Sequence, residues 1–315
     1  MLPFLQPLAT MPGLSVLIPV YNCDVRALVQ ALVSQAAAWP GPVELLCFDD
    51  ASEEPFRKLN REVAALPRVR YHELPHNLGR SAIRNRLAAE AVHPWLLLLD
   101  NNVRITSPEF LARYAAALLQ VPVIVGGSVY SETPPADVRQ HLRWHYGRTR
   151  EARPATERQQ APYAQFNLKN VLISAAVFRQ FPLDETLTQY GHEDTKLGWE
   201  LHQHAVPVYH MNNPVEHAAL EPAEVFLQKS QAAVYNLLQL YQAHGLGAET
   251  KLLATGLRLR RLGLAGVALR ALRQAEPWLT RKAQQANPSL RSFDLLKLLW
   301  LLQAWEPNSE NKKPA

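Results

Sequence analysis

Three groups of carboxylate side chains stand at points of the sequence where an active site could form. Asp49 and Asp50 follow one apolar run, Asp100 follows another, and Glu193 and Asp194 open a segment of helical character. A single acid at such a place usually caps a helix or makes a turn. Three groups at comparable places favour one shared site, in which carboxylates accept protons or hold a divalent cation.

Several other kinds of chemistry are excluded by motifs that the sequence lacks. No GxGxxG follows the first apolar run and no GxxxxGK[ST] occurs, so neither a dinucleotide site nor a P-loop is predicted. The GxSxG motif of hydrolases and the Cys/His spacing of zinc sites are absent as well. The two cysteines, Cys23 and Cys47, are too few for a disulfide scaffold and are interpreted as small packing residues.

The elements that must position the carboxylates alternate between strand and helix. Short apolar runs predict strands, and apolar residues spaced i, i+3, i+4 and i+7 predict helices. This order predicts a parallel sheet with helices on both faces, and such sheets bind ligands at the carboxyl ends of their strands. Asp49, Asp50 and Asp100 fall at such ends. The strands are predicted at 15–20, 43–48, 69–74, 95–99 and 121–130, and the helices at 25–36, 56–66, 81–91 and after Ser107-Pro108-Glu109.

The second half of the chain departs from this alternation. Residues 131–166 hold four prolines and six arginines in a stretch too long for an ordinary connection, which predicts a functional flap with some helix. Strands are predicted at 170–173 and 206–210, with a helix opening at Gly191 between them. From Pro222 onward the pattern is helical. We therefore expect two domains, one of residues 1–220 and a helical one of residues 221–315.

Composition and charge narrow the class of protein further. Of the 315 residues 48% are hydrophobic and 19% are charged, so the chain can bury a substantial core. Its longest apolar runs are far shorter than the ~20 residues that cross a bilayer. The N-terminus lacks the basic residues of a secretion signal, so the expected compartment is the cytoplasm.

The basic surplus of the chain lies in its C-terminal part. From Leu246 onward there are 12 lysines and arginines against 5 acidic residues. Such a tail indicates an anionic partner, either nucleic acid or the inner face of a membrane, or it is a solvated helical surface. We expect residues 293–305 to pack on the protein and the arginines at 258–273 to make a peripheral contact with the plasma membrane. Nucleic acid is not an expected partner.

Five blocks of the sequence, taken together, resemble the inverting glycosyltransferases of family 2, a family with the GT-A fold. Further blocks at Gly126–Tyr130, Pro134-Pro135, Arg143–Gly147 and Asn213–His217 are similar to bacterial members that build surface glycans. The resemblance implies a mostly parallel α/β sheet flanked by helices, here followed by a C-terminal helical extension. The five blocks are LSVLIPVYN at 14–22, FDDAS at 48–52, NLGRSAIRN at 77–85, LLLLDNNV at 96–103 and YGHEDTKLGWEL at 190–201.

The resemblance implies a hexosyltransferase of polysaccharide biosynthesis. It would move a sugar from a nucleotide-sugar donor, UDP-linked in most relatives, to a hydroxyl of a glycan or lipid-linked acceptor, with inversion of the anomeric centre. One alternative is a catalytically degenerate protein that binds glycans or serves as a scaffold. Another is a nucleotidyltransferase, but its GxGxR loop is replaced here by Pro19-Val20-Tyr21-Asn22.

The resemblance also assigns roles to individual residues. Asp194 would be the general base, and Glu193 would help to hold the acceptor hydroxyl. Pro19 and Tyr21 would line the pocket for the base of the nucleotide, and Asp50 would accept a hydrogen bond from that base. Arg80 and Arg84 would lie near the ribose and diphosphate, and Asp100 would open the motif that holds the nucleotide sugar and its metal ion.

The metal-binding motif departs from the pattern of the family. The family has Asp-x-Asp, whereas this chain has Asp100-Asn101-Asn102, and His217 matches a position that contacts the diphosphate or the metal. An amide oxygen ligates Mn²⁺ or Mg²⁺ without contributing charge, so Asn102 should weaken the site. We expect the cation to enter mainly with the donor. The rival expectation is that Arg80 and Arg84 alone neutralise the leaving group.

Overall fold

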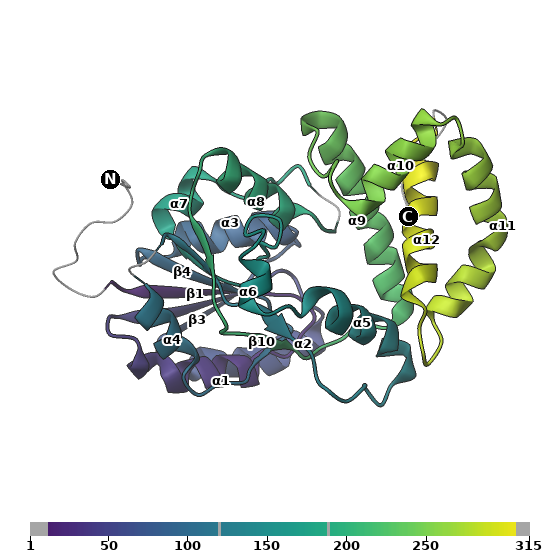
Figure 1. Cartoon of the computed structure of the whole chain (residues 1–315). Coiled ribbons are helices and arrows are strands. Elements are labelled where there is room, and N and C mark those ends of the chain that lie inside the picture. Colours follow the sequence, from purple (N-terminus) through teal and green to yellow (C-terminus); the bar gives the residue numbers. More distant parts are fainter. Residues whose placement is uncertain (1–11, 119–120, 188–189, 307–315) are drawn as a thin grey trace. The chain divides into compact units, whose positions relative to one another are not determined.

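The computed structural model describes residues 12–118, 121–187 and 190–306, and it divides into two compact units (Figure 1). The first, which we call the sheet unit, comprises Met1–Glu132, Arg150–Thr188 and Glu193–Ala219. The second, the helical unit, comprises Thr133–Thr149, Gln189–His192 and Leu220–Ala315. The predicted flap is therefore shared between the two units, and the expected domains 1–220 and 221–315 stay a prediction.

The sheet unit is built on seven strands in the order β3-β2-β1-β4-β8-β6-β9. Six of them run in one direction, and β8 is antiparallel to both of its neighbours. The predicted mostly parallel sheet is thereby confirmed. The strands are β1 (Leu14–Val20), β2 (Val43–Asp49), β3 (Val69–Glu73), β4 (Trp95–Leu99), β6 (Val123–Val125), β8 (Asn170–Ser174) and β9 (Val208–His210).

A second, three-stranded sheet has the order β5-β10-β7, from Val103–Ile105, Val215–His217 and Ser128–Val129. The single strand predicted at 121–130 is wrong, because its residues are divided between β6 and β7. The division falls at Gly126 and Gly127. Gly127 has a φ of +88°, and a Cβ there would lie 2.5 Å from Nη2 of Arg158, so only glycine fits.

Within the part of the sheet unit that the structure describes, seven α-helices connect or flank these strands. The predicted helix at 56–66 ends earlier, at Asn60, and continues as the 3₁₀ turn Arg61–Ala65. The helix predicted after Ser107-Pro108-Glu109 begins at Phe110, and Ser107 lies in a turn in which its Oγ accepts from the N–H of Glu109. The helices are α1 (Arg26–Gln35), α2 (Glu54–Asn60), α3 (Arg80–Glu90), α4 (Phe110–Ala117), α6 (Ala155–Arg158), α7 (Ala175–Gln180) and α8 (Glu193–Gln203).

The central strands β1, β2, β4 and β8 are buried on both faces, which explains their nearly continuous apolar sequences. Side chains alternate between the two faces of a strand. In β1, Val16 and Ile18 join one buried cluster with Leu32 of α1, whereas Leu17 joins a second cluster with Leu87 of α3. The carboxyl ends of these strands are left for polar residues.

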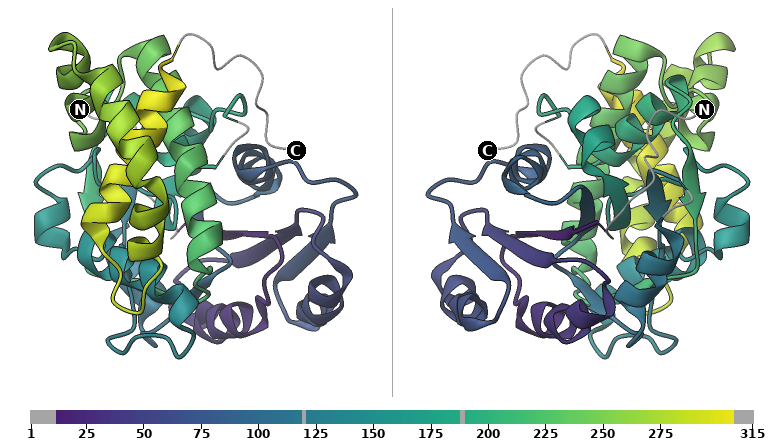
Figure 2. Two further views of the ribbon diagram at one scale, coloured as in Figure 1. Left: turned by 90° about the vertical axis from the view of Figure 1, so that its right-hand side faces the viewer. Right: turned by 90° about the vertical axis from the view of Figure 1, so that its left-hand side faces the viewer.

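Among its described residues the helical unit contains five α-helices, and α9, α11 and α12 lie side by side in it (Figures 1 and 2). The rings of Tyr146, Phe226 and Phe293 pack together in its core with centroids 5.3–5.5 Å apart. A π-helical turn at 147–151 follows α5. No helix in the described ranges is both long and apolar enough to cross a bilayer. The helices are α5 (His141–Tyr146), α9 (Ala223–His244), α10 (Lys251–Arg261), α11 (Ala265–Ala283) and α12 (Leu290–Ala304).

Candidate active site

Asp50 holds the loop that leads into α3. It follows β2, and its carboxylate accepts hydrogen bonds from the N–H groups of Leu78 at 2.6 Å and Gly79 at 3.1 Å. Its carbonyl accepts from Nδ2 of Asn77. Burial raises the pKa of Asp50. This carboxylate is therefore already engaged by the protein, although its predicted contact with the base of a nucleotide stays a prediction.

Its neighbour Asp49 has a structural role. The side chain is fully buried, with Oδ1 accepting from the N–H of Ser52 at 2.7 Å and Oδ2 from the hydroxyl of Tyr71 at 3.1 Å. Of the two acids that the sequence places together, only Asp50 lies next to the predicted donor-binding residues of α3.

Arg80 and Arg84, one turn apart on α3, connect the end of β4 to the start of α8. Nη2 of Arg84 makes an ion pair with Oδ1 of Asp100, and Nε of Arg80 donates to Oε1 of Glu193 at 2.6 Å. Nη1 of Arg84 also donates to the carbonyl of Arg80. The structure thus brings together four residues that the sequence assigned to one site.

The positive charges of this group lower the pKa of two of its carboxylates. Burial on its own would raise the pKa of Asp100, but the positive charges of Arg84, Arg80 and Lys169 outweigh it and bring the pKa to about 2. The pKa of Glu193 is likewise lowered, since the same two arginines overcome the effect of burial. Asp100 and Glu193 are therefore ionised at neutral pH.

Asp194 differs from its neighbour in this respect. Burial and the negative charge of Glu193 raise its pKa to about 6. Its Oδ1 accepts from the N–H of Thr195 at 2.7 Å in the first turn of α8. Adjacent carboxylates whose pKa values are pushed apart in this way are typical of sites that transfer protons.

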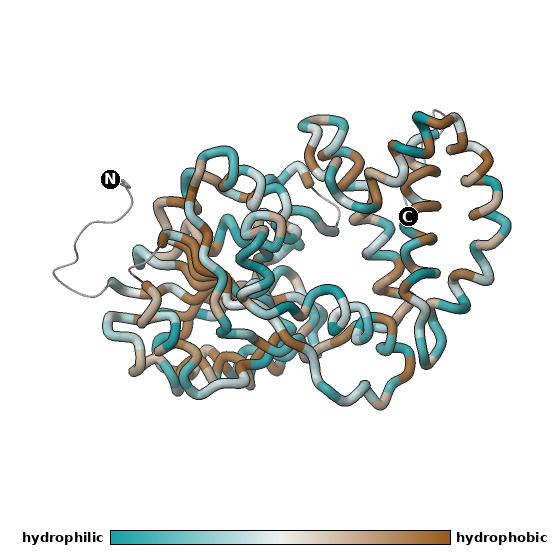
Figure 3. The backbone as a smooth tube through the Cα atoms, in the orientation of Figure 1, coloured by the Kyte–Doolittle hydropathy of each residue, from teal (hydrophilic) through white to brown (hydrophobic). Residues whose placement is uncertain are grey.

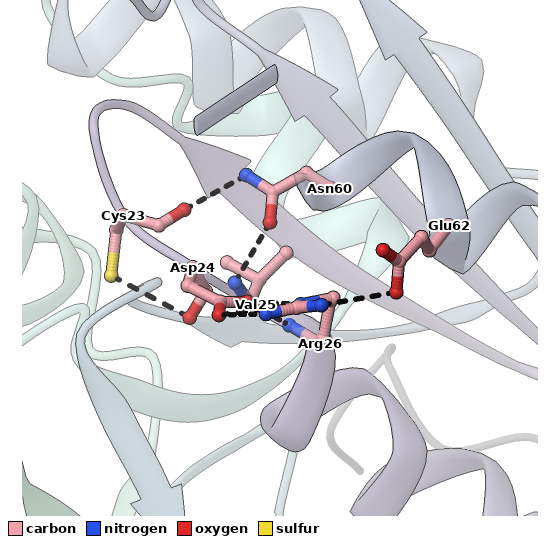
Figure 4. A network of polar contacts seen from close by, with 6 residues as sticks. All are labelled: Cys23, Asp24, Val25, Arg26, Asn60 and Glu62. Atoms are coloured by element: carbon pink, nitrogen blue, oxygen red, sulfur yellow. Dashed lines mark hydrogen bonds and ion pairs between the residues drawn. The ribbon is translucent and has the colours of Figure 1, made fainter. Parts of the chain in front are cut away.

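The loop after β1 is fixed by Asn60, a buried residue that the sequence did not single out (Figure 4). Asn60 donates from Nδ2 to the carbonyl of Cys23 at 2.8 Å and accepts from the N–H of Val25 at 3.0 Å. Cys23 is half-buried, and its thiol donates to the carbonyl of Asn101 at 3.3 Å. Burial raises its pKa to about 11, so it is not a reactive thiolate at neutral pH.

The predicted base-pocket residues Pro19 and Tyr21 stand at the carboxyl end of β1. Pro19 is half-buried within the strand, whereas the ring of Tyr21 is exposed just beyond it. The carbonyl of Tyr21 accepts from Nδ2 of Asn101 at 3.2 Å. An exposed ring beside the motif that begins at Asp100 has the position needed to stack on a base, and this role stays a prediction.

The second sheet brings Asn102 and His217 together. Nδ2 of Asn102 lies 3.2 Å from Nε2 of His217, and the ring of Tyr130 stacks on His217 with centroids 5.3 Å apart. Oδ1 of Asn102 is buried and has no hydrogen-bond partner among the described residues. A buried amide oxygen without a partner is costly unless something occupies it, so it fits a cation ligand.

These residues fit a weak cation site better than a strong one. Asn102 offers a neutral oxygen, His217 a ring nitrogen and Asp100 a carboxylate that Arg84 already binds. Within the described ranges no three Asp, Glu, His or Cys side chains cluster in a way that could hold a metal ion. The site thus carries little negative charge, as expected from a sequence in which Asn102 replaces the second acid of Asp-x-Asp.

Lys169 is a further cation beside Asp100 that the sequence did not reveal. Its carbonyl accepts from the N–H of Asp100 at 3.2 Å, and its Nζ lies 3.0 Å from Oε2 of Glu151. The hydroxyl of Tyr130 donates to the same Oε2. Lys169 precedes β8, whose antiparallel direction brings that loop beside the end of β4. A pattern of strands alone cannot indicate this reversal.

Arg158 is buried and clamps the ends of β6 and β9. Its guanidinium donates to the carbonyls of Gly126 at 3.2 Å and Met211 at 2.8 Å, and to Nδ1 of His210 at 2.6 Å. Nε2 of His210 lies 2.9 Å from the carbonyl of Pro162. Arg158, which lies within the functional flap predicted at 131–166, is therefore a structural cation.

Comparison with known proteins gives a family, a distant relative and a shared fold. Validoxylamine A glucosyltransferase of Streptomyces hygroscopicus subsp. limoneus is 28% identical over 242 residues, which cover 65% of this chain and 53% of the relative. Among solved structures, the mannosyltransferase PcManGT of Pyrobaculum calidifontis, in complex with GDP-Man and Mn²⁺, matches 94% of this chain and 87% of its own with a TM-score of 0.56 at 14% identity. TarS of S. aureus matches 72% of this chain and 40% of its own, with 15% identity and a TM-score of 0.47.

The chain thus spans about half the length of the curated relative and less than half of TarS. The similarity to PcManGT shows a common fold, the GT-A fold, in which a mostly parallel sheet is flanked by helices. The sequence of residues 15–187 matches the family described as "Glycosyl transferase family 2". Since this match covers more than half of the 315 residues, the chain belongs to glycosyl transferase family 2.

Proposed function

We propose that this protein transfers a hexose from a UDP-linked donor to a hydroxyl of a glycan or lipid-linked acceptor, with inversion of the anomeric centre. The observation that carries the proposal is the position of Asp194, a carboxylate of raised pKa, next to Glu193. The Glu193–Arg80 ion pair is joined to the Arg84–Asp100 ion pair by the hydrogen bond from Arg84 to the carbonyl of Arg80. The glucosyltransferase relative and the complex of PcManGT with GDP-Man support a nucleotide-linked hexose as donor, and the choice of UDP is part of the proposal.

In the proposed reaction Asp194 is the base. The acceptor oxygen forms a bond to the anomeric carbon while its proton passes to the carboxylate of Asp194. The bond from that carbon to the diphosphate oxygen breaks, and its electron pair leaves with the nucleoside diphosphate. One carboxylate suffices because attack comes from the face opposite the leaving group. Glu193, which Arg80 keeps ionised, helps to hold the acceptor hydroxyl.

The leaving diphosphate gains negative charge, which cationic side chains stabilise. In the proposal Arg80, Arg84 and Lys169 supply this charge, because all three act electrostatically on Asp100 and therefore lie around it. Tyr21 and Pro19 line the pocket for the base, and Asp50 accepts from the base in addition to holding the loop before α3.

Asn102, His217 and Asp100 would hold the divalent cation of the donor complex. A cation there would neutralise the charge that develops on the diphosphate. The buried Oδ1 of Asn102, which has no hydrogen-bond partner in the described part of the chain, favours this proposal. The protein contributes one carboxylate to the site, so we expect the phosphates of the donor to supply the remaining oxygen ligands. Mn²⁺ or Mg²⁺ would then bind together with the donor.

We place the proposed transfer in polysaccharide biosynthesis, in the cytoplasm at the inner face of the plasma membrane. The basic helices that include Arg258–Arg273 are the proposed peripheral contact. The alternative of a catalytically silent glycan-binding or scaffold protein finds no support among the comparisons. The substitution of Asn102 for an acid is the feature that would have favoured it.

The test is a donor screen with purified protein. UDP- and GDP-sugars are incubated with Mn²⁺ or Mg²⁺, and release of nucleoside diphosphate is followed by coupled assay, with and without added glycan acceptors. We expect slow hydrolysis of one UDP-hexose, acceleration by an acceptor, and a product whose anomeric configuration is opposite to that of the donor by NMR. No turnover of any donor, or a product of retained configuration, would contradict the proposal. The variant Asp194→Asn is the blank, and Glu200→Gln on the same helix is its matched control.

A further inference from the structure

The helical unit exposes large apolar side chains on the turn between α10 and α11 and on α11 itself. Leu262 is 56% exposed, Leu264 46%, Val267 63% and Trp278 54%. We call the exposed residues of 258–281 the α10–α11 face. Single exposed apolar residues are common, but a contiguous group of them marks a surface that binds a partner. Figure 3 shows hydrophobic and hydrophilic residues alternating along both helices.

On α11 the exposed apolar residues follow one side of the helix. Val267 and Trp278 are 11 residues apart, which is three turns or about 16 Å along the axis. Leu269 and Leu279 are buried in the core of the helical unit, so α11 packs against the rest of the unit through a different side. The exposed stripe is therefore not needed for packing within the unit.

The charge of the α10–α11 face is entirely positive over most of its length. Residues 250–275 contain six lysines and arginines and no acidic residue. Arg273 is paired with Glu306 at 2.6 Å, and Arg260 lies over the ring of Trp305 at 4.9 Å. Three other arginines of this segment have no carboxylate partner within the described ranges: Arg258, Arg261 and Arg270.

We propose that the α10–α11 face docks on an anionic phospholipid surface, with α11 lying along it. In this arrangement Leu262, Leu264, Val267 and Trp278 enter the interfacial layer, and the unpaired arginines meet lipid phosphates. Amphipathic helices with arginines beside apolar and aromatic residues bind in this way. The proposal deepens the peripheral membrane location proposed above by assigning the surface and the lipid class, and it is independent of the chemistry of transfer.

The combination of side chains selects this partner over others. Nucleic acid would engage the arginines through phosphates, but it offers no apolar layer for Leu264 or Trp278. A protein partner would explain the apolar side chains but not the absence of acids from 250 to 275. An anionic bilayer supplies both the apolar layer and the negative charge.

Co-sedimentation of the full chain with vesicles tests the proposal. One set of vesicles is pure phosphatidylcholine and the other contains 30% phosphatidylglycerol, both at about 100 mM salt. We expect binding to the anionic vesicles at least tenfold tighter than to the neutral ones. The combined variant Arg258→Gln, Arg261→Gln, Arg270→Gln should weaken this binding about fivefold per arginine, on the order of a hundredfold in all.

A second variant tests the apolar part. Leu264→Gln, Val267→Gln, Trp278→Gln keeps the charge of the face and should weaken binding to anionic vesicles tenfold or more. The matched control is Arg68→Gln, Arg86→Gln, Arg113→Gln, which removes the same charge from exposed positions of the sheet unit. It should change binding less than twofold. Circular dichroism establishes that the variants keep their helices.

The results separate this proposal from its rivals and from the proposed function. Equal binding to both kinds of vesicle, or equal loss in the control variant, would overturn it. So would a fluorescein-labelled DNA duplex bound as tightly as the anionic vesicles, or a dimer in sedimentation velocity that the apolar variant dissociates. Donor hydrolysis is measured on the same samples without lipid. Loss of vesicle binding with hydrolysis intact counts against the membrane surface alone, whereas failed hydrolysis with intact vesicle binding counts against the proposed function alone.

Discussion

Nε of Arg80 donates to Oε1 of Glu193 over 2.6 Å, although the two residues are 113 positions apart in the sequence. The Glu193 side chain is buried and Arg80 is partly exposed, so the arginine provides the charge that keeps a buried carboxylate ionised. Burial of Asp194 and, after it, the negative charge of Glu193 raise the pKa of Asp194. The acidity of the proposed base is thus set by its burial and by the charge of the adjacent Glu193.

Replacing Asp194 by asparagine removes the proton acceptor while preserving shape. We expect transfer to fall by about 10²–10⁴-fold, the usual scale for a general base. Nucleoside diphosphate binding, measured by calorimetry, should be nearly unchanged because the donor-binding residues belong to other elements. A variant that keeps a third of the wild-type transfer rate would rule out this role. Glu200→Gln, also on α8, should keep full activity.

The rate of transfer should depend on pH through Asp194. A base acts only when deprotonated, so a raised pKa moves the acidic limb of kcat/KM upward, to a pH of about 6. Below that value the rate should fall about tenfold per pH unit. Glu193→Gln removes the neighbouring negative charge and should shift this limb to lower pH. A pH profile that is the same in Glu193→Gln and the wild type would contradict the electrostatic coupling of the two residues.

Substitution of Asp50 should affect nucleotide binding in two ways. Asp50→Ala removes the acceptor for the base and also frees the N–H groups of Leu78 and Gly79. We expect the affinity for UDP to fall by about 1.5–3 kcal/mol, as for a hydrogen bond to a charged group. Asp50→Asn keeps one acceptor oxygen and should lose less. If calorimetry gives Asp50→Ala the UDP affinity of the wild type, contact of Asp50 with the base is excluded. Thermal unfolding of the same variant measures how much stability is lost when the loop before α3 is released.

Metal binding should be coupled to the donor because Asn102 brings no charge. Titration of Mn²⁺ into the free protein should show weak binding, and titration into protein saturated with UDP should show much tighter binding. Asn102→Asp adds a negative ligand and should raise the affinity of the free protein for Mn²⁺ while maintaining or increasing transfer. Tight binding to the free wild-type protein would show that the amide matters little. Binding in neither titration would favour neutralisation of the leaving group by Arg80 and Arg84 alone.

Stability should decline in acid because of His210. Burial, together with the positive charge of Arg158, lowers its pKa from an ordinary 6.5 to about 4. The unfolded chain therefore binds a proton at a higher pH than the folded one. The contribution of His210 is fully present above about pH 6.5 and is lost as the pH falls to about 4, a change of about 3 kcal/mol. Urea unfolding at pH 7 and 4.5 measures it.

His210→Gln should flatten this dependence on pH, whereas His202→Gln, which alters an exposed histidine, should not. An unchanged acid dependence in His210→Gln would show that the loss of stability arises elsewhere. Because Arg158 also contacts the carbonyls of Gly126 and Met211, its own substitution should be more destabilising than that of His210.

The order of the elements could be predicted from the sequence because apolar runs bounded by acids and prolines are strong signals of buried strands. Trp95–Leu99 was predicted with its observed bounds. The strand at 121–130 was not predicted correctly, because the φ of Gly127 and the clash with Arg158 depend on a contact with a distant segment. The helix predicted after Ser107-Pro108-Glu109 is present as α4, but Ser107 itself lies in a turn, which a serine-proline pair also fits.

The residues of the candidate site also fall into two groups, those that the sequence indicates and those that only the fold reveals. Asp50, Asp100 and Asp194 stand at ends of strands or helices, where the sequence indicates a position. Lys169 and Asn60 take part through tertiary contacts that no local pattern shows, because Lys169 depends on the reversed direction of β8. The pairing of Arg80 with Glu193, rather than with a neighbour on its own helix, likewise follows from the fold alone.

The order of strands in the sheet has a consequence for synthesis on the ribosome. The four adjacent strands β3-β2-β1-β4 are complete once Leu99 has been made, whereas β8, β6 and β9 come from later parts of the chain. Pairings between nearby segments cost the least loop-closure entropy, and chains emerge with their N-terminus first. The nascent protein therefore holds Asp50, Arg80 and Arg84 on paired strands and their connections long before Asp194 leaves the ribosome. The half that would recognise the donor is assembled ahead of the half that would carry out the reaction.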